Sequence, residues 1–541
     1  MLWSWGRMER HDAIVIGAGL NGLVAAAYLA QAGLDVLVLD RGTAPGGLAS
    51  EHEIAPGYRL PRFTLGSGGL PPRIVSDLGL ADHGLRFIRA EGGVTCFPDG
   101  RYHASYRDGV VYRREISRFS RVDADAFTRY RRDMLRAVRR LAPLLARPAH
   151  SGARGLFGRL RAQLAHADLI AAMSPDDMRD VLRLWTLPAS DFLDTYFEDD
   201  FVKAHLAAAA MIGGTLGPCT PTSAARLVLP WLAETGDASG GAPETLMPAG
   251  GTSALVQALV SAVGAAGGVL RMEAEVTDVR IRDGKVKGIV LANGEEIEAR
   301  AVLSGLDVKR SFLSLFQWKD LPEGLVERVG RVRMKGVAAK VNLALDAAPV
   351  FPGLPEGCPS IGGGLRLAGT IPAMERAFAD WRERMPPRDP LIDVLIPSLL
   401  DPSLAPEGGH VLSALVHYVP EELHDGPWTG ERRDALGDLV MTRLAEISPG
   451  IAEHVIAIEI LLPDDVENEI GLTSGDLSHG ETTLDQFFAN RPFPGAGGAE
   501  TPLKNFYLCS PSAHPGPLVM GGAGANAAST LLAAMGKRGR A

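Results

Sequence analysis

The stretch that decides the fold is HDAIVIGAGLNGLVAAAYLAQAGLDVLVLD, residues 11–40. Residues 13–16 form a short apolar, β-branched run suited to a buried parallel strand. The glycine-rich turn at residues 17–22 then opens a helix rich in alanine and leucine. A second apolar run, residues 35–39, ends in the acid Asp40. The pattern predicts a βαβ unit.

The three glycines of the turn each meet a physical need. Gly17, Gly19 and Gly22 provide a tight turn, close approach of the backbone to a pyrophosphate, and close packing of helix on strand. The helix that begins at Leu20 and Asn21 offers free backbone N–H groups and a partial positive charge to phosphates. These five residues are therefore candidates for binding phosphate groups.

Asp40 is placed to accept hydrogen bonds from the hydroxyls of a ribose. After it, Arg41 offers a guanidinium to phosphate or adenine, while Gly46 and Gly47, followed by Leu48, let the backbone run against a cofactor. Strand, glycines, helix, second strand and acid occur in the order that a dinucleotide site requires. The segment is predicted to bind a dinucleotide.

The chain returns to the nucleotide side twice more. Residues 248–253, PAGGTS, precede an apolar helix, and residues 269–305 form a predicted β-meander with Asp-Gly and Asn-Gly hairpin turns. Its last strand ends in Ser304, a candidate cofactor contact. A strand at 506–509 leads through a loop to a helix over 525–535.

None of these segments buries enough apolar surface alone, and a chain of 541 residues exceeds what one core usually supports. The predicted fold class is therefore α/β, with a Rossmann-like nucleotide-binding domain built from discontinuous segments and an α+β substrate domain. The nucleotide-binding domain takes residues 10–90, 245–310 and 500–536, the substrate domain takes 91–244 and 311–499, and residues 1–9 are a flexible tail.

Composition narrows the class of protein. A net charge of −9 provides no phosphate-neutralising excess, which argues against nucleic acid as a partner. The four cysteines are far apart without a CxxC pair, so no local dithiol motif exists and a reducing, cytoplasmic location is expected. No run is long and apolar enough to suggest a membrane span. The histidines and cysteines show no metal-ligand spacing, so no metal is expected.

Two stretches have two readings each. The arginine-rich residues 129–148 are interpreted as a solvated helix face, with an anionic-lipid or partner surface as the alternative. The apolar residues 200–232 are interpreted as core, with a tunnel for a hydrophobic substrate or a peripheral membrane contact as the alternative.

From end to end the chain resembles the phytoene-desaturase-like branch of the flavin amine-oxidase superfamily. Carotenoid desaturases and ketolases share the first and last of the matching blocks. Central blocks such as DTYFEDDFVKAHLA look more like a group named for a pyridine nucleotide-disulfide oxidoreductase domain. The matching blocks are IVIGAGLNGLVAAAYLAQAG, LDRGTAPGG, SDLGLADHGLRF, DTYFEDDFVKAHLA, PAGGTSAL, DPSLAPEGGHV, LSHGETTLDQFF and LCSPSAHPGPLVMGGAGANAA.

The resemblance implies FAD, bound extended across the Rossmann-like domain with its flavin ring at the domain interface. It implies that Val276 pairs its backbone with adenine. It also places the start of the last helix against the flavin ring, and the residues there that match the motif are Gly521, Gly522, Ala523 and Asn526. The chain departs from the family pattern at Ser510, Pro517 and Ala525, where the family often has glycine, glycine and arginine.

The expected chemistry is dehydrogenation, in which a flavin accepts a hydride and a protein group accepts a proton. His514, in the loop expected to meet the flavin, is the first candidate proton acceptor, and His479 is the second. Only one dinucleotide motif is present, so the electrons are expected to leave to oxygen, a quinone or a partner flavoprotein rather than to a nicotinamide. The substrate is expected to be an apolar or mixed small molecule.

Two alternatives remain open from the sequence. The first is a carotenoid desaturase, isomerase or ketolase that works at a membrane surface. The second is a flavin-binding regulatory or partner protein whose catalysis is reduced or lost. The oligomeric state is not indicated by the sequence.

Overall fold

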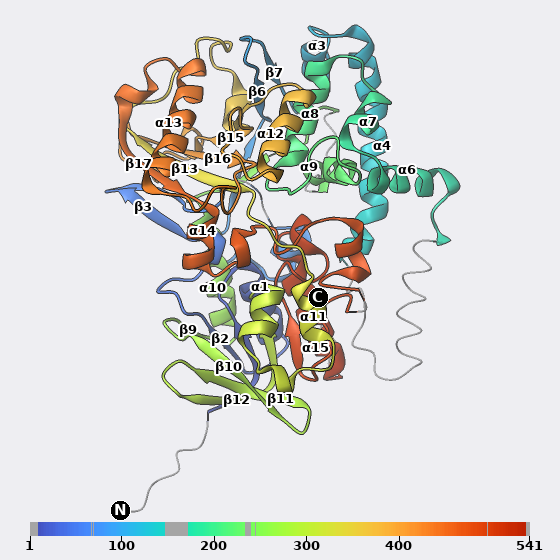
Figure 1. Ribbon diagram of the computed structural model, residues 1–541, viewed down its shortest axis with the longest axis vertical. Helices are drawn as coiled ribbons and strands as arrows, with labels where there is room; N and C mark the ends of the chain where they lie inside the picture. The colour runs from blue at the N-terminus through green and yellow to red at the C-terminus, as the bar shows by residue number, and fades with distance from the viewer. Residues whose placement is uncertain are drawn as a thin grey trace, which may run out of the picture.

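The computed structural model describes residues 9–66, 68, 70–146, 171–232, 240–243, 245–494 and 496–536. Two lobes are visible in Figure 1, and each is built around its own seven-stranded sheet. The lower lobe combines the two ends of the chain with a middle segment, so that blue, green and red ribbons lie side by side.

The sheet of the lower lobe has the strand order β10-β11-β12-β1-β2-β9, with β18 paired to β12. The pairs β12–β1, β1–β2, β2–β9 and β12–β18 are parallel, so the carboxyl ends of these strands meet at one edge. The strands are β1 (Arg10–Ile16), β2 (Val36–Leu39), β9 (Val269–Arg271), β10 (Val276–Arg282), β11 (Lys285–Leu291), β12 (Glu296–Ser304) and β18 (Phe506–Leu508).

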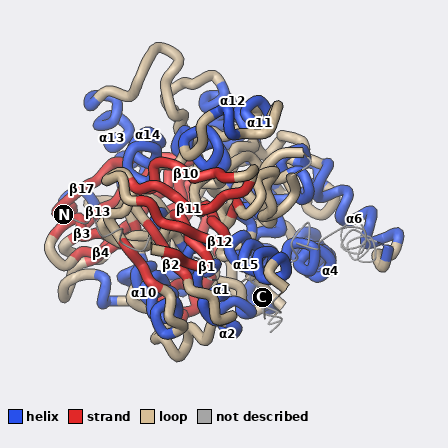
Figure 2. Tube along the Cα trace, turned by 90° about the horizontal axis from the view of Figure 1, so that it is seen from below, coloured by secondary structure: helices blue, strands red, loops and turns tan. Residues whose placement is uncertain are grey.

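Three apolar helices cover one face of this sheet, namely α1 (Leu20–Gln31), α10 (Thr252–Ala265) and α15 (Gly522–Ala534), as Figure 2 shows. Small residues let α1 and α15 pack closely, because a Cβ at Gly524 would overlap the carbonyl oxygen of Asn21. The three helices and the alternate strand residues that face them form one continuous core.

The opposite face of the sheet is covered by apolar side chains of the β-meander and of the chain after it. Residues 311–334, which the sequence assigns to the substrate domain, contribute Phe312 and Leu315 to this core, together with α11 (Leu325–Gly330). The packing therefore extends the nucleotide-side domain beyond the expected boundary at residue 310. Of the expected tail, residues 1–8 lie outside the described residues, while the carbonyl of Glu9 accepts a hydrogen bond from the N–H of Glu298.

The second sheet has the order β17-β13-β16-β15-β14-β6-β7, antiparallel except for the β14–β6 pair. One face packs on α13 (Gly430–Ile447), and the other faces α8 (Asp200–Met211). The strands are β6 (Val94–Cys96), β7 (Tyr102–Ala104), β13 (Ala338–Leu345), β14 (Leu365–Leu367), β15 (Ile392–Leu395), β16 (His410–His417) and β17 (Val455–Leu461). The α/β fold with an α+β second domain is thus confirmed.

The remaining regular elements are short or belong to the helical side of the upper lobe. Two antiparallel strand pairs form separate two-stranded sheets, β3 (Glu51–Ala55) with β4 (Tyr58–Pro61) and β5 (Phe87–Ala90) with β8 (Thr245–Pro248). The other helices are α2 (Pro72–Asp77), α3 (Gly109–Ile116), α4 (Arg121–Ala146), α6 (Pro175–Thr186), α7 (Ala189–Asp194), α9 (Leu229–Leu232), α12 (Ile371–Arg382) and α14 (Pro463–Asp465).

The arginine-rich stretch lies on α4 as far as residue 146, and residues 147–148 lie outside the described part. Its apolar side chains, such as Tyr130 and Met134, are buried. On the outer side Arg136 contacts Asp180 and Arg140 contacts Asp177, both on α6. These ion pairs agree with the interpretation of a solvated helix face. Within the described residues, no helix is both long and apolar enough to cross a bilayer.

Candidate functional site

The glycine-rich turn connects β1 to α1 at the carboxyl edge of the lower sheet. Gly17 has φ +97°, a conformation that glycine adopts without strain, and its N–H donates to Leu39 O at 2.7 Å. A Cβ at Gly22 would overlap the carbonyl oxygen of Gly17. No side chain caps α1, whose N-cap is Gly19, so its first N–H groups are left for a ligand.

Asp40 ties the end of β2 to this turn. One carboxylate oxygen accepts from Ala18 N and the other from Gly42 N, each at 2.7 Å. A carboxylate has about four acceptor sites, so lone pairs remain for the hydroxyls of a ribose. Asp40 therefore shapes the loop and is still able to bind a ligand.

A crevice of about 340 Å³ opens above these residues. Segments of the upper lobe close it from the other side, including Leu472, Leu477 and His479. Nine of the cofactor-binding residues predicted from the sequence line it: Gly17, Gly19, Leu20, Asn21, Gly22, Asp40, Gly46, Gly47 and Leu48. The structure therefore brings these nine residues together at one crevice, and their binding of a cofactor stays a prediction.

Three predicted residues have contacts with other parts of the protein. Arg41 donates to the carbonyls of Asn468 and Glu469, at 3.3 and 2.9 Å. The Ser304 hydroxyl is fully buried and lies 2.7 Å from the Ser311 hydroxyl. The two residues that follow Ser304 in the chain line the crevice. Val276 begins β10 opposite Leu291. Whether these residues contact the cofactor stays a prediction.

The start of α15 lies behind the crevice rather than on its wall. Gly524 N donates to the Asn21 side chain at 3.2 Å, which joins the starts of α15 and α1. Gly521, Gly522 and Ala523 pack in this junction, and the preceding Met520 lines the crevice. Asn526 donates to His514 O at 3.4 Å.

The two candidate proton acceptors lie in different places. His479 lines the crevice, and its Nδ1 is buried without a hydrogen-bond partner among the described residues. Burial lowers the pKa of His479 to about 4, so its imidazole is neutral at neutral pH. His514 donates from Nε2 to Leu144 O at 3.0 Å, which directs this ring nitrogen to α4. The structure brings only His479 of the pair to the crevice.

A buried arginine holds the loop that carries His479. Arg491 is 1% exposed and donates to Ser478 O at 2.8 Å, Glu481 O at 3.0 Å and Pro511 O at 2.6 Å. Burial lowers its pKa to about 10. This role was missed from the sequence, because a lone arginine in a loop carries no local signal of its partners.

A second cavity, of about 390 Å³, adjoins the crevice, since Gly68 lines both. Most of its wall is apolar and comes from α8, the α9 region and the helical side of the upper lobe, for example Phe127, Leu206 and Trp231. Three polar side chains interrupt this apolar wall, namely those of His205, Arg366 and Asp393. None of these three residues was singled out from the sequence.

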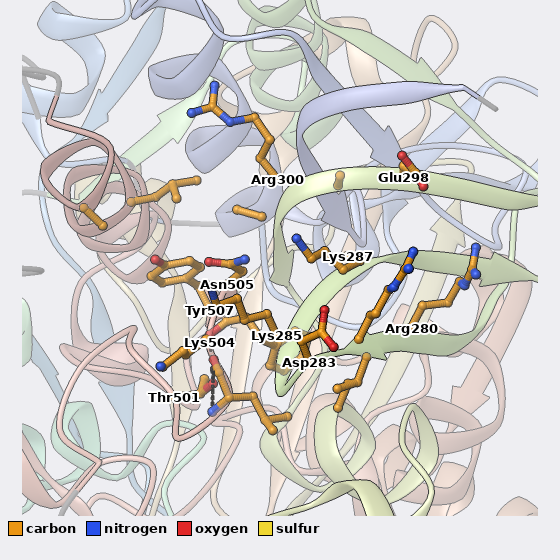
Figure 3. A pocket seen from close by; sticks show the side chains of 18 of the residues that line it. Arg280, Asp283, Lys285, Lys287, Glu298, Arg300, Thr501, Lys504, Asn505 and Tyr507 are labelled. Atoms are coloured by element: carbon orange, nitrogen blue, oxygen red, sulfur yellow. Dashed lines mark hydrogen bonds between the residues drawn. The ribbon is translucent and has the colours of Figure 1, made fainter. Parts of the chain in front are cut away.

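A third hollow, of about 1200 Å³, lies near the start of β1 and is shown in Figure 3. Its side chains, such as Lys285, Lys287 and Lys504, project from the β-meander and the loop before β18. The end of α15 reaches it at Met535. A dinucleotide phosphate favours the N-terminus of a helix. The helix end at this basic groove is instead the carboxyl end of α15, whose partial negative charge repels anions.

The first crevice fits the FAD that the family resemblance implies. It combines an uncapped helix N-terminus, an acid at the end of β2 and open space at Gly19, where an ideal Cβ would meet no heavy atom within 4 Å. No group of three or more His, Cys, Asp or Glu side chains in the described segments is arranged to hold a metal ion. All four cysteines are free.

Comparison with known proteins agrees with this geometry. The model of the flavin containing amine oxidoreductase family matches residues 20–516. Pyridine nucleotide-disulfide oxidoreductase domain-containing protein 2 of Mus musculus is 35% identical, over 97% of this chain and 94% of its own length. The phytoene desaturase of Neurospora crassa is 25% identical, over 95% of this chain and 83% of its own.

Solved structures show the same fold. An oxidoreductase from Methanosarcina mazei superposes with a TM-score of 0.57 at 18% identity, covering 96% of this chain and 99% of its own. At this identity the similarity concerns the fold alone.

Proposed function

The chain belongs to the flavin-containing amine oxidoreductase family and is an FAD-dependent oxidoreductase, and we propose that its substrate is a largely apolar small molecule that gives up a hydride. The observation that carries this proposal is the apolar cavity that shares Gly68 with the nucleotide crevice. Ligand pockets in proteins are typically apolar, of this size, and interrupted by a few polar groups.

The chain's own residues supply binding and orientation. The N–H groups at the start of α1, after Gly19, would bind the phosphates of FAD, and Asp40 would bind a ribose. Bound FAD supplies an acceptor for a hydride. The apolar cavity excludes water and holds the substrate beside the crevice.

Dehydrogenation also releases a proton, and His479 is the proposed acceptor. Its neutral imidazole faces the crevice, and its Nδ1 has no other partner in the described chain. Burial lowers the pKa of His479, so its imidazole is unprotonated and has a lone pair with which to accept the proton. His514, the first candidate from the sequence, is placed second here because its Nε2 donates to Leu144 O on α4.

Oxygen, a quinone or a partner flavoprotein is proposed to reoxidise the flavin, because the sequence contains a single dinucleotide motif. The carotenoid alternative is supported by the similarity to phytoene desaturase. Arg366, however, lines the cavity. A pure hydrocarbon would bury N–H donors of its guanidinium without offering a hydrogen-bond acceptor, which is unfavourable. The oxidoreductase of a mixed, largely apolar molecule is therefore the preferred proposal.

Anaerobic reduction of the FAD-loaded protein tests this proposal. A panel of apolar compounds is mixed with the protein, and loss of the oxidised-flavin absorbance is followed. Ala209→Phe, which fills the second cavity without touching the crevice, is expected to keep FAD and dithionite reduction but to lose reduction by substrate. Equal reduction rates in the variant and the original protein would contradict the assignment of the cavity. Failure of every compound to reduce the flavin would favour the non-catalytic alternative.

A further inference from the structure

We propose that Arg366 binds a carboxylate of the substrate, so that the second cavity takes an apolar monocarboxylate. This inference rests on the proposed function, because it names the substrate class of the same cavity. It starts from a row of polar side chains across the upper sheet. Thr95 on β6, Arg366 on β14 and Asp393 on β15 are direct cross-strand partners and project from the face opposite α13.

The Arg366 guanidinium is only partly used by the protein. Its Nε donates to Asp393 Oδ1 at 2.7 Å, and its side chain is 14% exposed. Nη1 and Nη2 make no hydrogen bond to the described residues, although Arg366 lines the cavity. Guanidinium groups pair with carboxylates through such parallel N–H donors, which makes these two nitrogens a ready anchor.

Asp393 positions Arg366 and accepts a hydrogen bond on each of its carboxylate oxygens. Its second oxygen accepts from His417 Nε2 at 2.8 Å, and Gly213 N donates to His417 Nδ1 at 3.3 Å. In this arrangement Nδ1 of His417 accepts from Gly213 N, and Nε2 is the nitrogen that donates to Asp393. Burial raises the pKa of Asp393, but Arg366 and His417 outweigh this effect, and the pKa lies below its usual value. Asp393 is therefore ionised and holds one edge of the guanidinium.

A second buried cation, Arg226, contacts a residue of the cavity wall. Arg226 is 5% exposed and donates to the carbonyls of Ala210 and Ile212 and to the Thr482 hydroxyl. Among the described residues no carboxylate lies within ion-pair distance of it. Ile212 also lines the cavity. Arg226 itself is not among the residues that line the cavity, so Arg366 is the guanidinium that a bound anion can reach there.

His205, which also lines this wall, is already paired and neutral. His205 contacts the Thr95 hydroxyl at 2.7 Å from Nδ1 and the Ser105 hydroxyl at 2.6 Å from Nε2. Burial lowers the pKa of His205 well below its usual value, with small contributions from His103 and Arg366. One monoanion therefore matches the free donors, whereas a phosphate dianion would need more donors than Arg366 offers.

Isothermal titration of the FAD-loaded protein with octanoate and with octan-1-ol tests the inference. The two probes share an apolar chain and differ in the charged head. Octanoate is expected to bind at least tenfold more tightly than octan-1-ol. In Arg366→Gln the preference is expected to disappear while octan-1-ol binding changes less than threefold. Arg280→Gln, in the groove of Figure 3, serves as the matched control and should keep the preference.

Loss of Arg366 leaves Asp393 without its cationic partner, so the double variant Arg366→Gln with Asp393→Asn provides a neutral pair of similar shape. It should retain FAD and lack the octanoate preference. Octan-1-ol binding as tightly as octanoate to the original protein, or a preference that persists in either variant, would overturn the inference. These titrations need no turnover. If neutral apolar compounds reduce the flavin and carboxylates show no preference, only this inference is refuted. If octanoate binds but no compound reduces the flavin, only the proposed function is refuted.

Discussion

The open space at Gly19 gives the sharpest prediction for cofactor binding. An ideal Cβ at this position meets no heavy atom within 4 Å, because it points into the crevice. Gly19→Val should therefore be tolerated by the protein alone. Its backbone is extended, with φ −68° and ψ 168°, which valine also adopts. The only expected cost to folding is the poorer N-cap, about 1 kcal/mol or less.

The same side chain should block FAD. A valine at Gly19 occupies the space next to the first N–H groups of α1, so the pyrophosphate has to withdraw from them. Losing two charge-assisted hydrogen bonds, at about 1.5–3 kcal/mol each, lowers the FAD affinity by at least about a hundredfold.

Titration of the apoprotein with FAD, together with urea unfolding, measures both effects. Gly264→Val on α10 is the matched control, because its Cβ also meets no heavy atom within 4 Å but lies away from the crevice. The control should keep its FAD affinity. A Gly19→Val protein that binds FAD within threefold of the original would refute the placement of the pyrophosphate.

Four further variants test other parts of the account. Gly22→Ala forces a Cβ against the Gly17 carbonyl, so both the FAD affinity and the unfolding free energy should fall. The unfolding free energy, measured by urea titration, should fall by about 1–3 kcal/mol. Unchanged values would contradict the close packing of this turn. Asp40→Asn should weaken FAD binding by about tenfold in the same titration, and an unchanged affinity would exclude a ribose contact. Arg491→Met leaves several loop carbonyls without donors and should lower the unfolding free energy by at least about 3 kcal/mol. A loss under about 1 kcal/mol would show that the hydrogen bonds from Arg491 to these carbonyls are dispensable. Burial lowers the pKa of Lys340 to about 7, below its value in the unfolded chain. Above pH 7 the unfolded state therefore holds more protons than the folded state, so the unfolding free energy should rise with pH from about 7 to about 10. Replacement of this lysine by methionine should remove that slope, and an identical slope in the variant would refute its origin.

The nucleotide end of the site was predictable because its signal is local. Strand, glycines, helix and acid are close in the sequence, and the side-chain periods reveal which elements they form. The meander was equally readable, since Asp283 and Gly284 take the positive φ values that a tight hairpin turn needs. The structure places nine of the predicted cofactor-binding residues on one crevice.

The substrate side was not predictable because its residues meet only through tertiary pairing. Thr95, Arg366 and Asp393 come from strands that lie far apart in the sequence, and only the register of the upper sheet makes them neighbours. The loop before α15 shows the same limit. His514 was expected at the flavin, but the direction of its ring depends on the carbonyl of Leu144, on a helix far away in the chain.

The most direct test of the central claim is an experimental structure of the protein with FAD bound. We predict that the pyrophosphate lies within hydrogen-bond distance of the N–H groups at the start of α1, with a ribose on Asp40 and the flavin ring at the junction with the apolar cavity near Gly68. Density for FAD in the basic groove of Figure 3, or a crevice closed by side chains in a preparation saturated with FAD, would contradict the account.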